Sequence, residues 1–198
     1  TSSKGSYECR FCINAAGAYA NEISKMVGIC VPVNPDSHEA GITEPVMHFL
    51  DPMIVDIRQG PESSNFYFYQ HATGQIVFCI TPSPNIWGYE IEQTSKFLPQ
   101  VSRRLINIMP SLSNLRVRRT WRGLYPMTPD GFPIIGESQN LPQGFIQAIG
   151  MCGQGFMLGP GVGELLTRLI TNDLSGEDKE VLAQLSPDRT FTNEEMLK

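Results

Sequence analysis

The stretch that most constrains the folding of this 198-residue chain is GMCGQGFMLGPGVGELLTRLI, residues 150 to 170, where six glycines fall within fourteen positions. It follows the short apolar run GFIQAIG, which is typical of a buried strand. Beyond the glycines, apolar residues recur at helical spacing and form a stripe of Val162, Leu165, Leu166, Leu169 and Ile170. The pattern predicts a strand, a glycine loop, and a helix that starts near Gly159 and ends near residues 172 to 176.

The glycine loop fits neither of the common phosphate-binding patterns, because GxxxxGK[ST] and GxGxxG are both absent from it. A flexible linker would be poor in apolar residues, whereas this loop carries Met151, Phe156, Met157 and Leu158. Glycines let the backbone approach a ligand closely, and the amides at a helix start favour an anionic group. A flat, partly apolar ligand that delocalises negative charge, such as a flavin ring, would fit this loop.

The amino-terminal segment YECRFCINAAGAYANEISKMVG predicts a strand up to Ile13, a turn of small residues from Asn14 to Gly17, and a helix that ends at Gly28. Two interpretations of the small turn stay open: close packing of strand against helix, or contact with a ligand. Prolines then recur between residues 31 and 60, and they favour extended pieces such as AGITEPVMHFL and MIVDIRQ.

The segment NFYFYQHATGQIVFCIT has two strand-like runs on either side of HATG, which predicts an antiparallel hairpin. A period of two places one set of side chains on each face: Tyr67, Tyr69 and His71 against Phe66, Phe68 and Gln70. Aromatic stripes of this kind are more often core than ligand contacts, so a ligand role for the tyrosines is the alternative.

The remaining segments alternate between helix, strand and turn. Apolar spacing predicts a helix over about 99 to 109 that Pro110 stops, and LRVRRTWRGLY predicts a strand. A tight reversal is expected at Asp130-Gly131, and the polar tail from LAQLSPDRTF onward is expected at the surface. Strands outnumber helices, and the helices lie near the two ends of the chain, so the predicted fold class is α+β with a discontinuous layout.

Charge and composition narrow the classes of function. The chain has 15 Lys and Arg against 20 Asp and Glu, and its longest basic cluster is RVRR, so nucleic acid is not an expected partner. No apolar run approaches the roughly 18 residues of a membrane span, and the first ten residues lack the apolar core of a secretory signal. We therefore expect a soluble protein.

The cysteines and histidines give little sign of a cross-linked or metal-binding protein. The five cysteines lack the spacing of a disulfide framework, which favours a reducing, cytoplasmic compartment. Cys9 and Cys12 form a CxxC without a second pair, and none of the three histidines is part of a ligand-like pair, so no metal site is expected. Because the chain starts without methionine just before a strand, we expect a fragment or a processed product.

Four motifs in order carry a resemblance to a known family: NAAGAYA, WRGLYPMTPDGFPIIG, FIQAIGMCGQGFMLGPGVGELLTRLI and LSPDRTF. Together they resemble the carboxy-terminal half of FAD-dependent amino-acid and amine oxidoreductases, the family of D-amino-acid oxidase, glycine oxidase and sarcosine oxidase. The similarity is greatest to the beta subunit of sarcosine oxidase, where a GLY-x-MTPD stretch is typical. Each motif alone is modestly specific, but the ordered set is highly specific and covers most of the chain.

The resemblance implies the C-terminal portion of a two-domain protein, with an FAD-binding domain of the glutathione reductase type and a substrate domain with a large mixed sheet. On that plan residues 1–31 belong to the FAD domain, residues 32–118 form the substrate domain, and residues 119–198 return to the FAD domain. The family's amino-terminal GxGxxG is absent from this chain. We therefore expect the chain alone to bind FAD weakly or not at all, and to need a missing amino-terminal FAD-binding segment or partner subunits.

The resemblance also implies a non-covalent FAD held by two segments. The residues beside the cofactor are Asn14, Ala15, Ala16, Gly17 and Ala18, and those that line the flavin ring are Gly153, Gln154, Gly155, Phe156 and Met157. The implied reaction oxidises the C–N bond of a small amine or amino acid, such as sarcosine, glycine or proline, by hydride transfer to the flavin. The start of the helix near Gly159 would stabilise negative charge on the reduced ring.

Departures from the family pattern bear on substrate and electron acceptor. Tyr125 stands where D-amino-acid and glycine oxidases carry an arginine and sarcosine oxidases a tyrosine, which implies a catalytic Tyr125 and favours secondary amines. Gly123 replaces the cysteine that bonds the flavin in monomeric sarcosine oxidase, and Met157 replaces its oxygen-activating lysine. A dehydrogenase that passes electrons to another acceptor is therefore an alternative to an oxidase.

The resemblance places the remaining site candidates on the hairpin and the following strand. Tyr67 is a second catalytic candidate, and Tyr69 and Arg122 are candidates for binding the substrate. Arg58, Arg116 and Arg118 stay open as partners of a substrate carboxylate. The alternative function is a non-catalytic binding or interaction module derived from the substrate domain.

Overall fold

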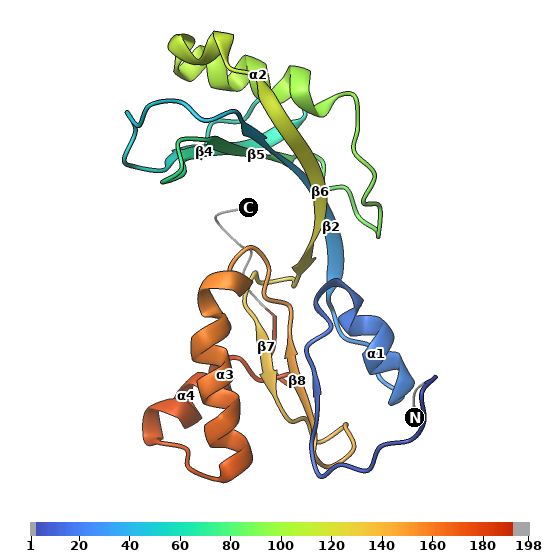
Figure 1. Cartoon of the computed structure of the whole chain (residues 1–198). Coiled ribbons are helices and arrows are strands. Elements are labelled where there is room, and N and C mark those ends of the chain that lie inside the picture. The colour runs from blue at the N-terminus through green and yellow to red at the C-terminus, as the bar shows by residue number, and fades with distance from the viewer. Residues whose placement is uncertain (1–2, 192–198) are drawn as a thin grey trace. The chain divides into compact units, whose positions relative to one another are not determined.

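The computed structural model describes residues 3 to 191. Within this range the chain forms two compact units: unit 1 comprises residues 3–35 and 125–191, and unit 2 comprises residues 36–124. The chain crosses between them twice, within strand β2 (Asn34–Thr43) and within strand β6 (Val117–Met127) (Figure 1). The sequence-based boundaries fell a few residues earlier, and the assignment of the units to an FAD part and a substrate part stays a prediction.

Unit 1 is built on a three-stranded sheet in the order β1-β8-β7. Strand β1 (Cys12–Asn14) runs parallel to β8 (Phe145–Ile149), and β7 (Ile134–Gly136) runs antiparallel to β8 on its other side. All five residues of β8 are buried, as expected for a central strand whose two faces are both covered. The buried strand predicted from GFIQAIG is confirmed.

Helices pack on both faces of this sheet. The 3₁₀ helix η1 (Gly17–Tyr19) and helix α1 (Ala20–Met26) follow β1, while α3 (Gly155–Thr171) and α4 (Gly176–Gln184) follow β8. Alternation along β7 and β8 supplies two cores: Ala20, Val31, Val33, Ile134 and Ile149 on one face, and Ile135, Ile146, Ala148, Leu165 and Leu166 on the other. The predicted order of strand, small turn and helix is confirmed, but the strand covers only Cys12–Asn14, so Asn14 lies in the strand and not in the turn.

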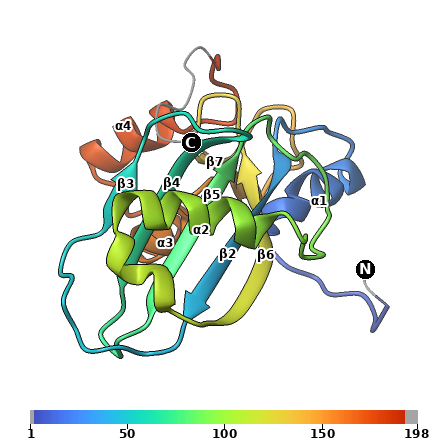
Figure 2. The same cartoon turned by 90° about the horizontal axis from the view of Figure 1, so that it is seen from above.

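Unit 2 is a five-stranded sheet in the order β3-β4-β5-β2-β6. Strands β3 (Ile54–Asp56), β4 (Ser63–Gln70), β5 (Ile76–Pro82) and β2 form successive antiparallel pairs. Helix α2 (Phe97–Ile108) and the 3₁₀ helix η2 (Pro110–Asn114) cover one face (Figure 2). The core of this layer consists of Leu50, Phe66, Phe68, Ile76, Phe78, Ile80, Phe97, Val101, Leu105 and Leu112.

The predicted hairpin is confirmed, because β4 and β5 pair with Tyr67 opposite Cys79 and Phe68 opposite Phe78. The helix predicted over 99 to 109 is α2, with Pro99 in its first turn. In the extended piece expected over 40 to 50, strand β2 ends at Thr43, and residues 44 to 50 form neither helix nor strand. Pro45 has no N–H to donate to a neighbouring strand, so the sheet pairing stops there.

Candidate functional site

Two segments of unit 1 leave the same end of its sheet. Strands β1 and β8 are parallel, with Asn14 opposite Gln147, so residues 15–18 and 150–155 both follow carboxyl ends of neighbouring strands. Crevices at the carboxyl ends of parallel strands are the usual ligand positions in open sheets with helices on both faces. The two segments predicted to contact the cofactor therefore lie at the same end of the sheet, beyond the carboxyl ends of β1 and β8.

The glycine loop rests against the end of β6. A Cβ atom on Gly153 would lie 3.5 Å from Cε2 of Tyr125, so the tyrosine ring packs on the bare Cα. The Cys152 N–H donates to the carbonyl of Pro126 at 3.2 Å. Gly150 has a φ of 66°, and a Cβ there would come within 2.3 Å of the Thr128 methyl group. The structure thus brings the predicted catalytic Tyr125 together with the predicted flavin-contacting Gly153.

Helix α3 begins at Gly155, earlier than the predicted start near Gly159. Gln154 is its N-cap residue, and no side chain caps the first turn. Phe156 is 100% exposed and Met157 is 72% exposed, so two apolar side chains stand in solvent at the helix start. Uncapped amides beside exposed apolar side chains fit a flat, partly apolar group that carries negative charge.

The predicted cofactor segment from Asn14 to Ala18 divides into a buried and an accessible part. Asn14 is buried, and its Nδ2 donates to the carbonyl of Ala20, to Ser24 Oγ and to Gln147 Oε1 at 2.9 to 3.0 Å. Gln147 Nε2 donates to the same Ser24 Oγ at 3.0 Å. Asn14 therefore joins β1, β8 and α1 in the interior, while Ala15 is exposed and residues 16–18 are half-buried.

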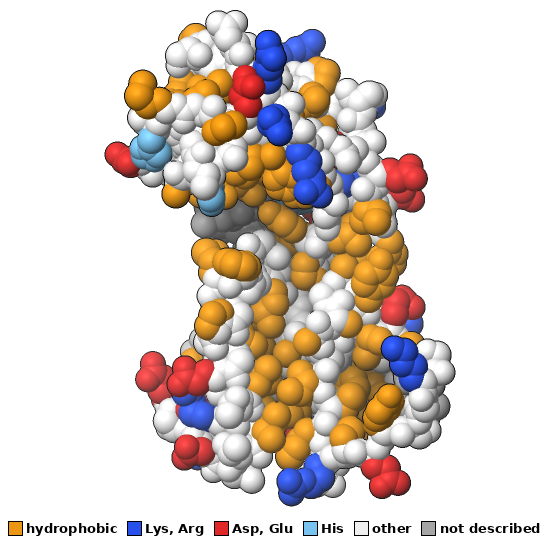
Figure 3. Space-filling view, in the orientation of Figure 1, with side chains coloured by type: hydrophobic (Ala, Val, Ile, Leu, Met, Phe, Trp, Pro, Cys, Tyr) orange, Lys and Arg blue, Asp and Glu red, His pale blue; other side chains and the backbone are white. Residues whose placement is uncertain are grey.

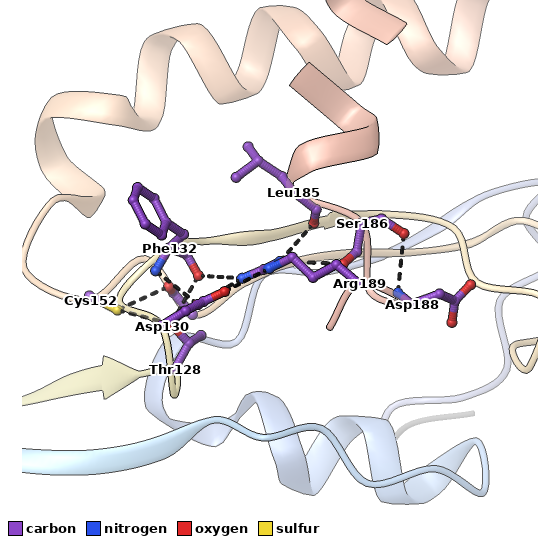
Figure 4. A network of polar contacts seen from close by, with 9 residues as sticks. Thr128, Asp130, Phe132, Cys152, Leu185, Ser186, Asp188 and Arg189 are labelled. Atoms are coloured by element: carbon purple, nitrogen blue, oxygen red, sulfur yellow. Dashed lines mark hydrogen bonds and ion pairs between the residues drawn. The ribbon is translucent and has the colours of Figure 1, made fainter. Parts of the chain in front are cut away.

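A buried ion pair links the C-terminal segment to the turn after β6 (Figure 4). Arg189 donates from Nε and Nη2 to the two carboxylate oxygens of Asp130 at 2.9 and 3.0 Å. Burial alone would raise the pKa of Asp130, but hydrogen bonds from Arg189 and from the Phe132 backbone outweigh it and hold that pKa below the ordinary carboxyl value. The expectation that the LAQLSPDRTF tail only covers the surface is wrong at Arg189, whose side chain is 11% exposed.

Unit 2 carries the predicted tyrosines on the sheet face opposite α2. Phe66 and Phe68 are fully buried in the core, while Tyr67 and Tyr69 alternate with them and are half-buried. Burial raises the pKa of the Cys79 thiol to about 11, an effect that a hydrogen bond with Tyr67 partly offsets. The tyrosines are accessible, as a substrate contact requires.

The candidate arginines of unit 2 differ in their surroundings. Arg122 is half-buried, and its Nη1 donates to the carbonyl of Glu92 at 2.8 Å. Arg58 forms an exposed pair with Asp56, whose pKa is lowered chiefly by Arg58 and also by Arg104. Arg116 and Arg118 are exposed. Of these arginines, Arg122 is the one that is half-buried and whose guanidinium is held by a hydrogen bond to a backbone carbonyl.

A polar group on β2 was not anticipated from the sequence. Asp36 is buried and lies 3.1 Å from His38 Nε2, and it accepts hydrogen bonds from Asn85 and from the Ile86 N–H. Glu39 accepts two hydrogen bonds from Thr94. These contacts fasten the segment from 85 to 94 along β2. The polar run from Asp36 to Glu39, next to Pro35, gave no signal of a buried strand.

Residues 3 to 191 offer neither a metal cluster nor a membrane-spanning helix. No cluster of three or more His, Cys, Asp or Glu side chains is arranged to hold a metal ion in that range. No helix in the same range combines the length and apolarity that a membrane crossing requires.

Comparison with known proteins gives matches at the level of family, sequence and structure. Residues 1–169 match the family described as FAD dependent oxidoreductase (DAO). Hydrogen cyanide synthase subunit HcnC of Pseudomonas aeruginosa is 30% identical over 171 residues, which cover 86% of this chain and 39% of that protein. Sarcosine oxidase subunit beta of Rhizobium meliloti is 27% identical over 176 residues, which cover 85% and 38%.

Among solved structures, L-proline dehydrogenase from P. horikoshii is similar with a TM-score of 0.77 and 32% sequence identity. The match covers 89% of this chain and 46% of that one. The chain therefore spans less than half the length of each of these relatives.

Proposed function

Since the chain belongs to the family of FAD dependent oxidoreductases, we propose that it takes part in oxidising the C–N bond of a small amine or amino acid such as sarcosine, glycine or proline. The observation that carries the proposal is the packing of Tyr125 on Gly153, beside the exposed and uncapped start of α3. This arrangement puts a polar aromatic side chain next to backbone that a flat ring can approach. The similarity to a proline dehydrogenase and to a sarcosine oxidase subunit supports this substrate class.

Residues of unit 1 fit non-covalent FAD. Gly153 and Gly155 present backbone without a Cβ, and Phe156 and Met157 supply apolar contact. The half-buried residues 16–18 lie at the same end of the sheet. The α3 amides would stabilise negative charge on a bound ring. When bound, the flavin supplies the acceptor for the hydride taken from the carbon next to the substrate nitrogen.

In this proposal the side chains of the protein orient the substrate and exclude water. Tyr125, through its hydroxyl, and Tyr67 are the proposed catalytic side chains, and Tyr69 and Arg122 are the side chains proposed to bind the substrate. Because Met157 has no amine that could activate oxygen, we propose a dehydrogenase with another electron acceptor. Gly123 offers no nucleophile for covalent attachment of the flavin.

The proposal also includes a polypeptide partner for unit 1. Within residues 3 to 191, β1 pairs with β8 on one side only, and Ile13 in β1 and the preceding Phe11 are 40% and 39% exposed. Figure 3 shows hydrophobic side chains gathered over the sheet of unit 1. An unpaired edge with exposed apolar side chains suits an additional strand, and we propose that it comes from an amino-terminal FAD-binding segment or a partner subunit. The five free cysteine thiols suit a reducing, cytoplasmic location.

The decisive experiment is a visible spectrum of the full-length protein. We expect flavin absorption bands that are bleached under anaerobic conditions by sarcosine, L-proline or glycine. Flavin bands that no amine or amino acid bleaches would point instead to a non-catalytic binding module.

A matched pair of variants then tests Tyr125. Tyr125→Phe should lower the rate of bleaching while the flavin content stays the same. Tyr89→Phe, which removes a hydroxyl from an exposed side chain of unit 2, is the control. An unchanged rate in Tyr125→Phe would remove this residue from the site.

A further inference from the structure

The Asp130–Arg189 pair, which we call the clamp, joins two short pieces of unit 1. Besides its two bonds to Asp130, the Arg189 guanidinium donates to the carbonyls of Leu185 and Phe132 at 3.1 and 2.9 Å. It also lies 4.5 Å from the ring centroid of Phe191. All of these partners belong to the tail from 185 to 191 or to the turn from 128 to 132. The clamp therefore holds the turn and the tail in one fixed arrangement (Figure 4).

Thr128 continues this arrangement into the glycine loop. Its Oγ1 donates to the Phe132 carbonyl at 2.9 Å and lies 3.2 Å from Asp130 Oδ1. The same atom lies 3.5 Å from Cys152 Sγ. Its methyl group lies so close to Gly150 that no Cβ fits between them. One buried side chain thus contacts the turn on one side and the loop on the other.

An ion pair such as the clamp is better suited to fixing the positions of its partners than to raising the free energy of unfolding. Replacing a buried ion pair by well-packed apolar residues is often neutral or stabilising, so such a pair is weak grounds for a purely stabilising role. A bidentate arginine–carboxylate contact instead fixes both position and orientation of its partners. The turn that it fixes is the one on which Gly150 and Cys152 rest.

We propose that the Asp130–Arg189 clamp is a positioning element for the flavin: through Thr128 it sets the position of the loop from 150 to 153. The flavin part of this inference rests on the proposed function. The coupling between clamp and loop does not require the flavin, so the two parts can fail separately.

Hydrogen exchange of the full-length protein tests the coupling. Arg189→Lys keeps the charge but loses the two-pronged contact, and Thr128→Val removes the hydroxyl but keeps a methyl group against Gly150. In both variants we expect the amides of 150–155 to exchange about tenfold faster. Ser175→Ala, which removes the α4 cap in the same unit, should leave those amides unchanged. The double variant should be less than additive, since both changes break one connection.

Faster exchange confined to residues 185–191 in Arg189→Lys would overturn the coupling, because the clamp would then hold only the tail. Equal acceleration at 150–155 in Ser175→Ala would also overturn it, because the effect would be a general loss of stability. Arg189→Lys is preferred to Arg189→Ala, which leaves a buried Asp130 without a partner.

The flavin itself tests the second part. With FAD as the probe, Arg189→Lys and Thr128→Val should raise the Kd for FAD about tenfold and shift the midpoint potential and visible spectrum of the bound flavin. Ser175→Ala should match the wild type in all three. An unchanged potential and spectrum in the clamp variants would overturn the positioning role. If the wild type binds no FAD, the proposed function and the flavin part fail, and the exchange comparison still decides the coupling.

Discussion

Large apolar side chains are exposed in both units, but the two units differ in the surroundings of the phenylalanines nearest their proposed roles. In unit 2, Phe66 and Phe68 are fully buried beneath α2, with ring centroids 5.5 Å apart. In unit 1, Phe11 and Ile13 on the sheet edge are about 40% exposed, and Phe156 at the start of α3 is fully exposed. Unit 2 closes its core with its own helix layer. Unit 1 leaves apolar surface where a cofactor and further polypeptide are proposed to bind.

A second difference is the kind of residue at the centre of each unit. The interior of unit 1 includes a hydrogen-bonded group of Asn14, Ser24 and Gln147, each at most 2% exposed. The core between the sheet and α2 in unit 2 is apolar. Buried amides add directional contacts that fix strand and helix positions, whereas apolar packing depends mainly on volume. In unit 1 these amides therefore help to fix the strand ends from which residues 15–18 and 150–155 leave.

The largest expected effect is the difference between truncating a buried and an exposed phenylalanine. Phe68→Ala in unit 2 should lower the free energy of unfolding by about 3–5 kcal/mol, because it leaves a cavity in a closed core. Phe156→Ala in unit 1 should change it by less than about 0.5 kcal/mol, because the ring contacts solvent. Denaturant titration with tryptophan fluorescence reports on unit 2 alone, since Trp87 and Trp121 both lie there.

Hydrogen exchange of α3 provides the corresponding readout for unit 1. If Phe156→Ala destabilises unit 1 as strongly as Phe68→Ala destabilises unit 2, the difference in burial between the two phenylalanines has no energetic consequence. The proposed flavin contact gives Phe156→Ala a separate signature, a weaker affinity for FAD in the full-length protein.

A smaller effect is expected from the polar interior of unit 1. Asn14→Ala should lower the free energy of unfolding by about 1–3 kcal/mol, because the buried Ser24 and Gln147 side chains lose a hydrogen-bond partner that water cannot replace. The measurement is exchange of the β8 amides in the full-length protein. Asn140→Ala, which truncates an exposed side chain of the same unit, should stay within about 0.5 kcal/mol of the wild type. Equal costs for the two variants would mean that the network has no special role.

The smallest expected effect is a pH dependence at the edge of unit 1. The pKa of Asp178 is lowered by the Ser175 N–H, with further contributions from Arg168 and the Ser175 hydroxyl. Its stabilising contribution is therefore present above the unfolded value of roughly 3.9 and is lost as the pH falls through the lower folded value. Amide NMR signals of α4 should show this loss in the wild type. Asp178→Asn should flatten the profile, and an unchanged profile would assign it to another group.

Local periodicity explains which parts of the fold could be predicted. The alternation of Phe66 and Phe68 with Tyr67 and Tyr69 identified the two faces of a strand, because a period of two is a local property. Helical spacing is also a local property, and it identified the buried stripe of α3 that includes Leu165 and Leu166. The family assignment was also predictable, since the order of four motifs carries it.

Other features depend on contacts between distant residues. Gly155 has low helix propensity, and the sequence predicted a loop up to about Gly159, but α3 begins at Gly155. The partner of Arg189 is Asp130, 59 residues earlier in the chain, and no local pattern pairs them. The clamp, and the support that it gives to the glycine loop, therefore became visible only in three dimensions.

The double crossing of the chain through β2 and β6 has a consequence for evolution. Unit 2 is a continuous insertion into unit 1, and its two ends lie on neighbouring strands of one sheet. Closing a longer loop costs little entropy, about 0.6 kcal/mol for each doubling of its length. Mutation can therefore lengthen, shorten or rebuild the inserted unit with little penalty to the unit that it interrupts. Such a layout lets the inserted unit diverge between lineages while the unit that it interrupts is inherited unchanged.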